Sequence, residues 1–139
     1  MTIVVVRDGV MAVDSRVSAG SFLMGDIQKW REAPSKYGGG FVAGVGFTGE
    51  IGAAMDGFIS TGADVICKDA AFIHLMANGV VRHSDGGPWF EPMGDFHAAG
   101  SGRELAIGAM AMGASALKAA EVACDYCIDC GGNIEVLKI

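Results

Sequence analysis

The chain has few basic side chains, and they do not cluster. Lys and Arg together number 10 against 16 Asp and Glu, which gives a formal net charge of −6 at pH 7. An electrostatic grip on nucleic acid or on an anionic membrane surface needs clustered Lys and Arg. We therefore expect no nucleic-acid partner and no membrane partner.

Long apolar runs, linkers, low-complexity segments and repeats are also lacking. Gly or a charged residue interrupts each apolar stretch well short of the roughly 20 residues that a membrane helix requires, and no charged segment precedes a signal-like core. A chain of 139 residues holds one good core and is too short for two. We predict a cytoplasmic protein in which residues 1–139 form a single domain.

Apolar side chains, by contrast, are abundant. Hydrophobic residues make up 51% of the chain and the mean hydropathy is +0.39, which is apolar for a protein of this size. Such a composition indicates surface that is buried against other subunits. We therefore expect a homo-oligomer.

Four cysteines raise the question of a metal site. Cys124, Cys127 and Cys130 follow the C-x2-C-x2-C spacing of thiolates that hold iron–sulfur clusters or zinc. The residues before them have a helical pattern, in which residues three apart share one face, and free cysteine is among the most buried residue types. A fourth ligand would have to be the remote Cys67 or a histidine. We favour a packing role and expect no metal and no cofactor.

Two turn dipeptides predict β-hairpins. Asp-Gly at 8–9 joins apolar runs at 2–7 and 10–14, and Asn-Gly at 78–79 joins runs at 70–77 and 80–83. The remaining elements that we expect are strands within 22–32, at 41–46 and at 133–139, a loop at 84–96, and helices at 49–64, 103–113 and 116–129, the last with Ser115 as N-cap and Gly131 and Gly132 as its stop. Antiparallel hairpins with segregated helices indicate an α+β fold in which two stacked sheets lie between helical layers.

A glycine motif follows the strand at 41–46. Gly44, Gly46 and Gly49 have the G-x-G-x-x-G spacing of the dinucleotide-binding fingerprint. That fingerprint needs a parallel βαβ unit, whereas the next strands here pair as a hairpin. Glycine N–H groups between a strand and a helix can still bind a negative oxygen, and an oxyanion suits this position as well as a phosphate.

Several polar residues have an ordinary structural interpretation. Asp14 can be a solvated strand end or part of an Asx turn, and a lysine within a strand, such as Lys29, usually faces water. His74, His83 and His97 have neither ligand spacing nor an evident partner. We assign no role to the three histidines.

The residue that opens the first strand is a threonine. The turn of the first hairpin fixes a register in which Thr2 lies opposite Ser15 and Ile3 lies opposite Asp14. Removal of Met1, which we expect because Thr is small, leaves a free α-amine on a residue that carries a hydroxyl. An α-amine titrates near about 7.7–8, close to the pH at which a general base works. Thr2 could therefore supply both nucleophile and base.

Five stretches, in order and over nearly the whole chain, resemble landmarks of the proteasome β-subunit and its bacterial relative, the HslV peptidase. They are TIVVVRDGVMAVDSRVSAG, QKWRE, AGVGFTGE, AAGSGRELAIGAMAMGAS and CGGNIEVLKI. The resemblance implies an N-terminal-nucleophile hydrolase, whose fold is a four-layer αββα sandwich. The family carries a helical pair where residues 50–68 leave room for about one helix at 1.5 Å per residue, so we expect a shortened member.

The resemblance implies a catalytic role for three of these residues. Thr2 would be the nucleophile, Lys29 the cation that lowers the pKa of its hydroxyl, and Asp14 the carboxylate that keeps Lys29 charged and oriented. In the predicted register Asp14 and Thr2 lie on opposite pleats. We therefore expect Asp14 to act on Thr2 through a third group.

The resemblance also implies roles for three residues around the nucleophile. The N–H of Gly46 would stabilise the tetrahedral oxyanion. Ser101 would assist proton movement near the α-amine, and the backbone of Ser18 would pair with an extended substrate.

The activity that the resemblance implies is a threonine peptidase that cleaves peptides or unfolded proteins through an acyl-enzyme on Thr2. Two alternatives stay open, a catalytically silent assembly subunit and an amidase for small amides on the same fold. In the family, the helices that correspond to residues 50–68 face neighbouring subunits and a regulatory ATPase. The short segment here therefore argues against carrying over an ATPase unfoldase as a partner.

Overall fold

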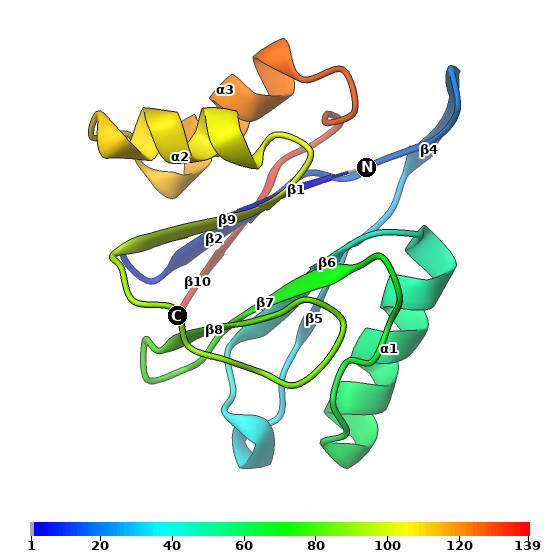
Figure 1. The fold of residues 1–139 in the computed structure, drawn as a ribbon, viewed down its shortest axis with the longest axis vertical. Helices are drawn as coiled ribbons and strands as arrows, with labels where there is room; N and C mark the ends of the chain where they lie inside the picture. Colours follow the sequence, from blue (N-terminus) through cyan, green and yellow to red (C-terminus); the bar gives the residue numbers. More distant parts are fainter. Residues whose placement is uncertain (1) are drawn as a thin grey trace.

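The computed structural model describes residues 2–139, and the predicted removal of Met1 lies outside them. The fold mixes antiparallel sheets with three α-helices (Figure 1). The strands are β1 (Ile3–Arg7), β2 (Val10–Val13), β3 (Arg16–Ala19), β4 (Phe22–Asp26), β5 (Trp30–Glu32), β6 (Phe41–Val45), β7 (Ala71–Leu75), β8 (Val81–Ser84), β9 (Phe96–Gly100) and β10 (Glu135–Lys138). The helices are α1 (Thr48–Thr61), α2 (Arg103–Ala111) and α3 (Ala116–Tyr126), with a 3-10 turn at Ser35–Tyr37. The predicted α+β class is confirmed.

The first sheet has the order β10-β2-β1-β9 and is built around the predicted hairpin. Asp8 and Gly9 both have positive φ, 52° and 72°, as a two-residue turn that matches strand twist requires. Val4 pairs with Val13, and Asp14 N donates to Ile3 O at 3.3 Å. The predicted register of β1 and β2 is therefore confirmed as far as Ile3 and Asp14, at the open end of the hairpin.

The second sheet has the order β5-β6-β7-β8 and is antiparallel throughout. Strands β7 and β8 form the predicted hairpin, but Leu75 lies opposite Val81 and Met76 N donates to Val80 O, so its turn holds residues 77–79 rather than the predicted 78–79. Val45 at the end of β6 pairs with Ala71 at the start of β7. The strand after the glycine motif is therefore antiparallel to the strand before it. This arrangement excludes the parallel unit on which a dinucleotide fingerprint depends.

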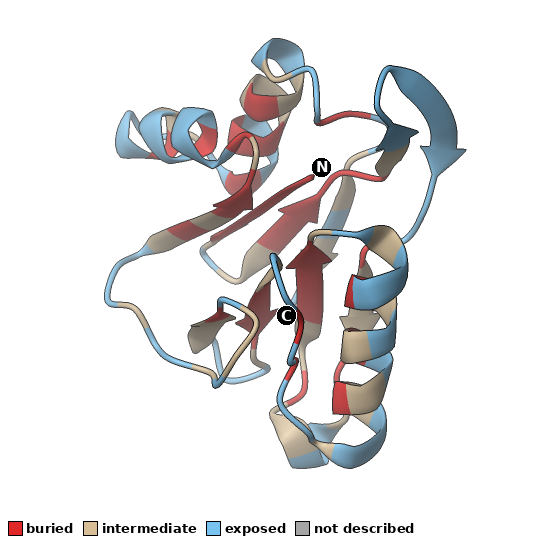
Figure 2. Ribbon diagram, turned by 45° about the vertical axis from the view of Figure 1, so that its right-hand side comes forward, coloured by how far each residue is buried: buried red, intermediate tan, exposed pale blue. Residues whose placement is uncertain are grey.

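Three apolar clusters show how the elements stack. Alternate residues of β1 face opposite sides: Ile3 and Val5 pack under α2 and α3, whereas Val4 and Val6 face β6 and β7 of the other sheet. The third cluster joins the second sheet to α1 through Ile51, Met55, Phe58 and Phe72. Both faces of β1 are thus buried, as Figure 2 shows, which explains its unbroken apolar sequence. None of the helices in residues 2–139 is long and apolar enough to cross a membrane.

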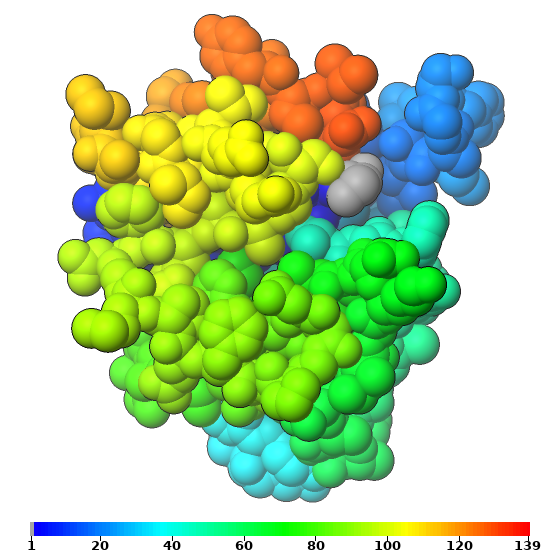
Figure 3. All heavy atoms as spheres, in the orientation of Figure 1, coloured from blue at the N-terminus to red at the C-terminus, as the bar shows by residue number. Residues whose placement is uncertain are grey.

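The hairpin formed by β3 and β4 was not predicted. One strand was expected within 22–32, whereas two lie there, β4 and β5. Strand β4 pairs with β3 in a two-stranded sheet of their own, and β5 belongs to the second sheet. All five residues of β4 are exposed, Phe22 at 69%, so no alternation of buried and exposed positions marks the strand. Figure 3 shows this hairpin projecting from the body at the upper right.

Several boundaries differ from the sequence prediction. Helix α1 ends at Thr61 rather than at 64, and α2 ends at Ala111 rather than at 113. Strand β9 occupies residues 96–100, and its first residue, Phe96, was predicted to belong to the loop at 84–96. The strand is held by its pairing with β1, from Ile3↔Gly100 to Arg7↔Phe96. Helix α3 ends at Tyr126 rather than at 129, because Cys127 is extended, with ψ of 116°. The predicted N-cap is confirmed, since the Ser115 side chain accepts from Lys118 N.

Candidate active site

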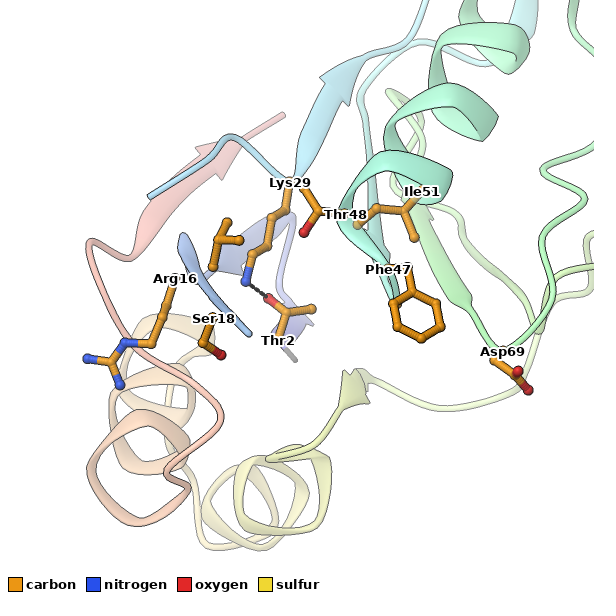
Figure 4. Close-up of a pocket in the computed structure, with 10 residues that line it drawn as sticks. Thr2, Arg16, Ser18, Lys29, Phe47, Thr48, Ile51 and Asp69 are labelled. Atoms are coloured by element: carbon orange, nitrogen blue, oxygen red, sulfur yellow. Dashed lines mark hydrogen bonds between the residues drawn. The ribbon is translucent and has the colours of Figure 1, made fainter. Parts of the chain in front are cut away.

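Thr2, Asp14 and Lys29 meet in one buried cluster. The Thr2 hydroxyl donates to Asp14 Oδ1, and Lys29 Nζ donates to Thr2 Oγ1 at 2.8 Å and to Asp14 Oδ1 at 3.1 Å. Their exposed fractions are 2%, 1% and 4%. Figure 4 shows the Lys29 and Thr2 side chains pointing toward one another. The interpretations of Asp14 as a solvated strand end and of Lys29 as a water-facing lysine are therefore wrong.

Three strand ends bring these residues together. Thr2 immediately precedes β1 and Asp14 immediately follows β2, so the hairpin places both at its open end. Lys29 precedes β5 in the other sheet, where Gly44 N of β6 donates to its carbonyl oxygen at 3.2 Å. The lysine thus reaches from one sheet to the hairpin end of the other.

One expectation about Asp14 needs correction. We expected it to act on Thr2 only through a third group, whereas the Thr2 hydroxyl donates to the carboxylate directly and Lys29 bonds to both. The reason is local: Thr2 lies before the first ladder pair of β1, so strand pleating does not dictate the direction of its side chain.

The Asp14 carboxylate is held on both of its oxygens. Besides the contacts above, Oδ1 accepts from Ile3 N at 3.1 Å and Oδ2 accepts from Gly131 N at 2.9 Å. Burial raises the pKa of Asp14 above its ordinary value of 3.8, while the charge of Lys29 and the two backbone N–H groups act in the opposite direction. These partners are what compensates a carboxylate that solvent does not reach.

Gly46 lies at the mouth of the same cluster, directly after β6. Its φ of +145° favours glycine, and a Cβ there would lie 3.1 Å from both Ala70 Cβ and Ile51 Cγ2. Gly46 and Thr2 line one pocket. Its role as the oxyanion donor stays a prediction.

Ser101 contacts Thr2 through the backbone. Ser101 N donates to Thr2 O at 2.9 Å. The chain approaches closely here because Gly100, with φ of +110°, has no Cβ that would collide with the Thr2 carbonyl oxygen. The predicted proton-transfer role of the Ser101 hydroxyl is a separate matter and remains a prediction.

The pocket at Thr2 has a volume of about 320 Å³. Apart from Thr2, Lys29 and Gly46, its lining consists of Arg16, Val17, Ser18, Phe47, Thr48, Ile51 and Asp69 (Figure 4). One wall therefore comes from β3, which the sequence analysis did not find, and another from the start of α1. The exposed Ser18 lies on that β3 wall, and its pairing with a substrate remains a prediction.

Comparisons with known proteins identify the fold of the chain. No protein-family model and no curated protein sequence matches the chain. Among solved structures, HslV from Trypanosoma brucei matches with a TM-score of 0.70 and 19% identity over 99% of each chain. The chain has the HslV fold. The resemblance read from the five sequence stretches is confirmed at this level.

A second HslV-fold neighbour is BPH from Thiobacillus denitrificans. Its structure in complex with epoxomicin matches with a TM-score of 0.70 and 15% identity, over 98% of this chain and 96% of BPH. A further structure of BPH gives 0.69 and 14%, over 97% and 95%. At such identities the similarity establishes the fold, and the roles of individual side chains have to be argued from this chain's own geometry.

The histidines of this HslV-fold chain lie away from the pocket lining. His74 is fully buried, with Nε2 at 2.7 Å from Gly39 O and Nδ1 accepting from Arg82. His83 and His97 contact each other at 3.1 Å. Within residues 2–139, no group of three or more His, Cys, Asp or Glu side chains is arranged to hold a metal ion.

Sequence reasoning missed Gly131 as a site residue. The residue was interpreted as a helix stop, whereas its N–H binds Asp14 and its carbonyl oxygen accepts from Ser15 N and Arg16 N at 3.2 and 3.0 Å. No local pattern connects residues 117 positions apart. The only available signal was that CGGNIEVLKI belonged to the resemblance.

Proposed function

We propose that the protein is a threonine-type N-terminal-nucleophile hydrolase that cleaves peptide bonds through an acyl-enzyme on Thr2. The observation that carries this proposal is the hydrogen bond from the buried Lys29 ammonium to Thr2 Oγ1, at 2.8 Å, in the lining of a pocket. A cation at this oxygen stabilises the alkoxide that develops as the hydroxyl loses its proton. Asp14 compensates and orients that cation.

The reaction begins once Met1 has been removed. The free α-amine of Thr2 takes the Oγ1 proton, and Oγ1 attacks the carbonyl carbon of the substrate. The Gly46 N–H stabilises the resulting oxyanion, and Ser101 supports proton movement at the amine. The amine then protonates the leaving group and activates the water that hydrolyses the ester.

The pocket favours a peptide with an apolar side chain beside the cleaved bond. Val17, Phe47 and Ile51 contribute apolar surface next to Thr2, and burial of such a side chain against them is favourable. The backbone of Ser18 on β3 would hold the substrate extended by strand pairing. Short peptides and unfolded chains are the substrates that meet both conditions.

The finer aspects of architecture form part of the same proposal. We infer that residues 1–139 make up a single domain, and that its stack of helices and sheets is the four-layer αββα sandwich with one shortened helical segment. We further propose that the protein works in the cytoplasm as a homo-oligomer. It does so without an ATPase unfoldase, because α1, with 14 residues, is the one helix available between residues 50 and 68.

Intact-mass analysis with epoxomicin tests the proposed chemistry. Epoxomicin offers a ketone to the hydroxyl and an epoxide to the amine, so a stable adduct requires both groups on one residue. We expect the purified protein to lack Met1 and to gain one epoxomicin, attached to Thr2. The same protein with an acetylated α-amine serves as the control and should not form the adduct. Retention of Met1, or absence of the adduct from trimmed protein, would contradict an active hydrolase and favour a silent subunit.

Sedimentation velocity at micromolar concentration tests the oligomer. Helices α2 and α3 expose Leu105 at 39%, Leu117 at 37% and, just beyond α2, Met112 at 89%, and we expect this surface to be buried between subunits. Met112→Lys should therefore shift the protein toward smaller species. Met93→Lys, at a fully exposed residue of another loop, is the matched control and should not. A wild type that sediments only as a monomer would disprove the prediction.

A further inference from the structure

The end of α3 leads into a tight turn with a thiol at each end. Cys130 N donates to Cys127 O at 3.2 Å, which is the i to i+3 hydrogen bond of a β-turn. In such a turn the two Cα atoms lie within about 7 Å, and disulfides join Cα atoms at about 4.4–6.8 Å. Both side chains are free thiols.

The two thiols differ in their access to solvent. Cys127 is half-buried, whereas Cys130 is 1% exposed. Burial raises the pKa of the Cys130 thiol, and it raises the pKa of Cys124, within α3, to about 11. These two thiols therefore stay protonated, and Cys127 is the sulfur that an oxidant in solution reaches first.

The residue after this turn is the partner of Asp14. Gly131 N donates to Asp14 Oδ2 at 2.9 Å. The turn is also fixed to the start of β3, because Cys130 O accepts from Arg16 Nη1 at 3.1 Å and Gly131 O accepts from Arg16 N at 3.0 Å. Any movement of Cys130 is thus transmitted to the buried carboxylate through one peptide unit.

The sulfur of Cys130 also lies behind the segment that holds Thr2. A Cβ placed on Gly102 would lie 3.3 Å from Cys130 Sγ, so the thiol packs directly against Gly102. The preceding residue, Ser101, donates its N–H to Thr2 O. The turn therefore contacts the backbone on both sides of the cluster formed by Thr2, Asp14 and Lys29.

We propose that Cys127 and Cys130 are a redox modification site, at which a hydroperoxide forms a reversible disulfide that weakens the hold of Gly131 on Asp14. The Cys127 sulfur attacks the peroxide oxygen, giving a sulfenic acid and releasing an alcohol, or water when the oxidant is hydrogen peroxide. The Cys130 sulfur then attacks the sulfenic sulfur and releases water. In total, two thiols lose two hydrogens and two electrons, and the O–O bond is reduced.

The disulfide has a geometric consequence at the site. Its sulfurs lie about 2 Å apart, much closer than two thiols in contact, so Cys130 is drawn toward Cys127 and away from its present position. A charge-assisted hydrogen bond to a carboxylate weakens steeply with such a displacement. Loss of this hydrogen bond leaves Asp14 less well placed to hold Lys29. The expected effect on catalysis rests on the proposed function.

The chemical part of the proposal is tested by oxidation of the purified protein with hydrogen peroxide, followed by alkylation of the remaining thiols and peptide mapping. We expect Cys124 to be alkylated and Cys127 and Cys130 to be joined, with the loss of two hydrogens and recovery in dithiothreitol. Cys127→Ser should form no intramolecular disulfide, whereas the matched variant Cys67→Ser should form it as the wild type does. A link between Cys124 and Cys127, or no link, would overturn the proposal.

The coupling to the site has two independent readouts. Amide hydrogen exchange at Gly131, followed by NMR, should quicken on oxidation in the wild type and in Cys67→Ser and stay unchanged in Cys127→Ser. The rate of epoxomicin addition to Thr2 should fall about tenfold, the size of effect that loss of one hydrogen bond to a charged group produces. Unchanged exchange at Gly131 in the oxidised protein would overturn the coupling. If the reduced protein does not react with epoxomicin, the proposed function fails, and the exchange rate alone decides this inference.

Discussion

Replacement of Thr2 by alanine is expected to abolish hydrolysis and epoxomicin addition, lowering the rate by at least about 10³-fold. Alanine removes the Oγ1 that bonds to Lys29 and Asp14 and leaves the α-amine in place. Alanine, like threonine, is small enough at position 2 for Met1 to be removed, so the variant and the wild type should lose Met1 to the same extent. The measurement is the rate of cleavage of an apolar fluorogenic peptide, together with the mass of the adduct.

Two companions make the Thr2 result specific. Thr2→Ser restores a hydroxyl and should retain part of the activity. Thr61→Ala removes a hydroxyl that donates to Gly57 O and accepts from Ala63 N at the exposed end of α1, away from the pocket, and should cleave at the wild-type rate. If Thr2→Ala cleaves peptides as fast as the wild type, Thr2 is not the nucleophile and the mechanism is wrong.

Lys29→Met is expected to be nearly as damaging as loss of the nucleophile, with a fall of about 10²- to 10³-fold in rate. Methionine keeps most of the length of the side chain and removes the charge from Oγ1 and from Asp14. A carboxylate left buried without its cation also destabilises the fold, typically by about 3–5 kcal/mol. The rate must therefore be measured well below the melting temperature of the variant.

Controls separate the catalytic from the structural effect of Lys29. Lys36→Met, at an exposed lysine of the 3-10 turn, should change neither rate nor melting temperature noticeably. Asp14→Asn should slow the reaction somewhat less than Lys29→Met, and the double variant should be no slower than Lys29→Met alone, because residues that act as one unit are not additive. Fully additive losses would show that the two residues act independently.

The pH dependence of the wild type follows from Asp14. Because burial raises its pKa above 3.8, the folded protein holds this proton more tightly than the unfolded chain does. The contribution of Asp14 to stability is therefore greatest below pH 3.8 and is lost as pH rises through the raised value. Activity should change in the opposite direction over that range, since only the carboxylate pairs with Lys29. Asp14→Asn should lack this increase of activity with rising pH.

The parts of the fold that local sequence determines could be predicted. An Asp-Gly pair suits the positive φ angles that a two-residue hairpin turn requires, and Asp8 and Gly9 have them. The first hairpin and its register therefore followed from two residues. Strand β9 has no comparable signal, because its backbone hydrogen bonds depend on β1, whose paired residues lie 89 to 97 positions earlier in the chain. The β3–β4 hairpin carries exposed apolar side chains on both faces and therefore shows no periodicity.

The candidate site was predictable to the same extent. The register placed Thr2 beside the end of β2, and the resemblance singled out Lys29, which on its own has the pattern of a surface lysine. The direct bond between Thr2 and Asp14 depends on a side-chain direction outside the ladder. The contact between Asp14 and Gly131 depends on where α3 ends and the chain turns, which the apolar pattern placed three residues too late.

The contact between Gly131 and Asp14 also sets a time at which the site can be completed. A ribosome makes Ile3 and Lys29 within 11 and 15 residues of Asp14, but Gly131 follows only 117 residues later. A nascent chain thus contains the proposed nucleophile, the cation and the carboxylate long before it contains the amide that binds the carboxylate. Contacts of such sequence separation form late and slowly in folding. For the proposed peptidase, this delay would keep growing chains from cutting themselves or their neighbours, because the site would be complete only when the last strand is ready to join the sheet.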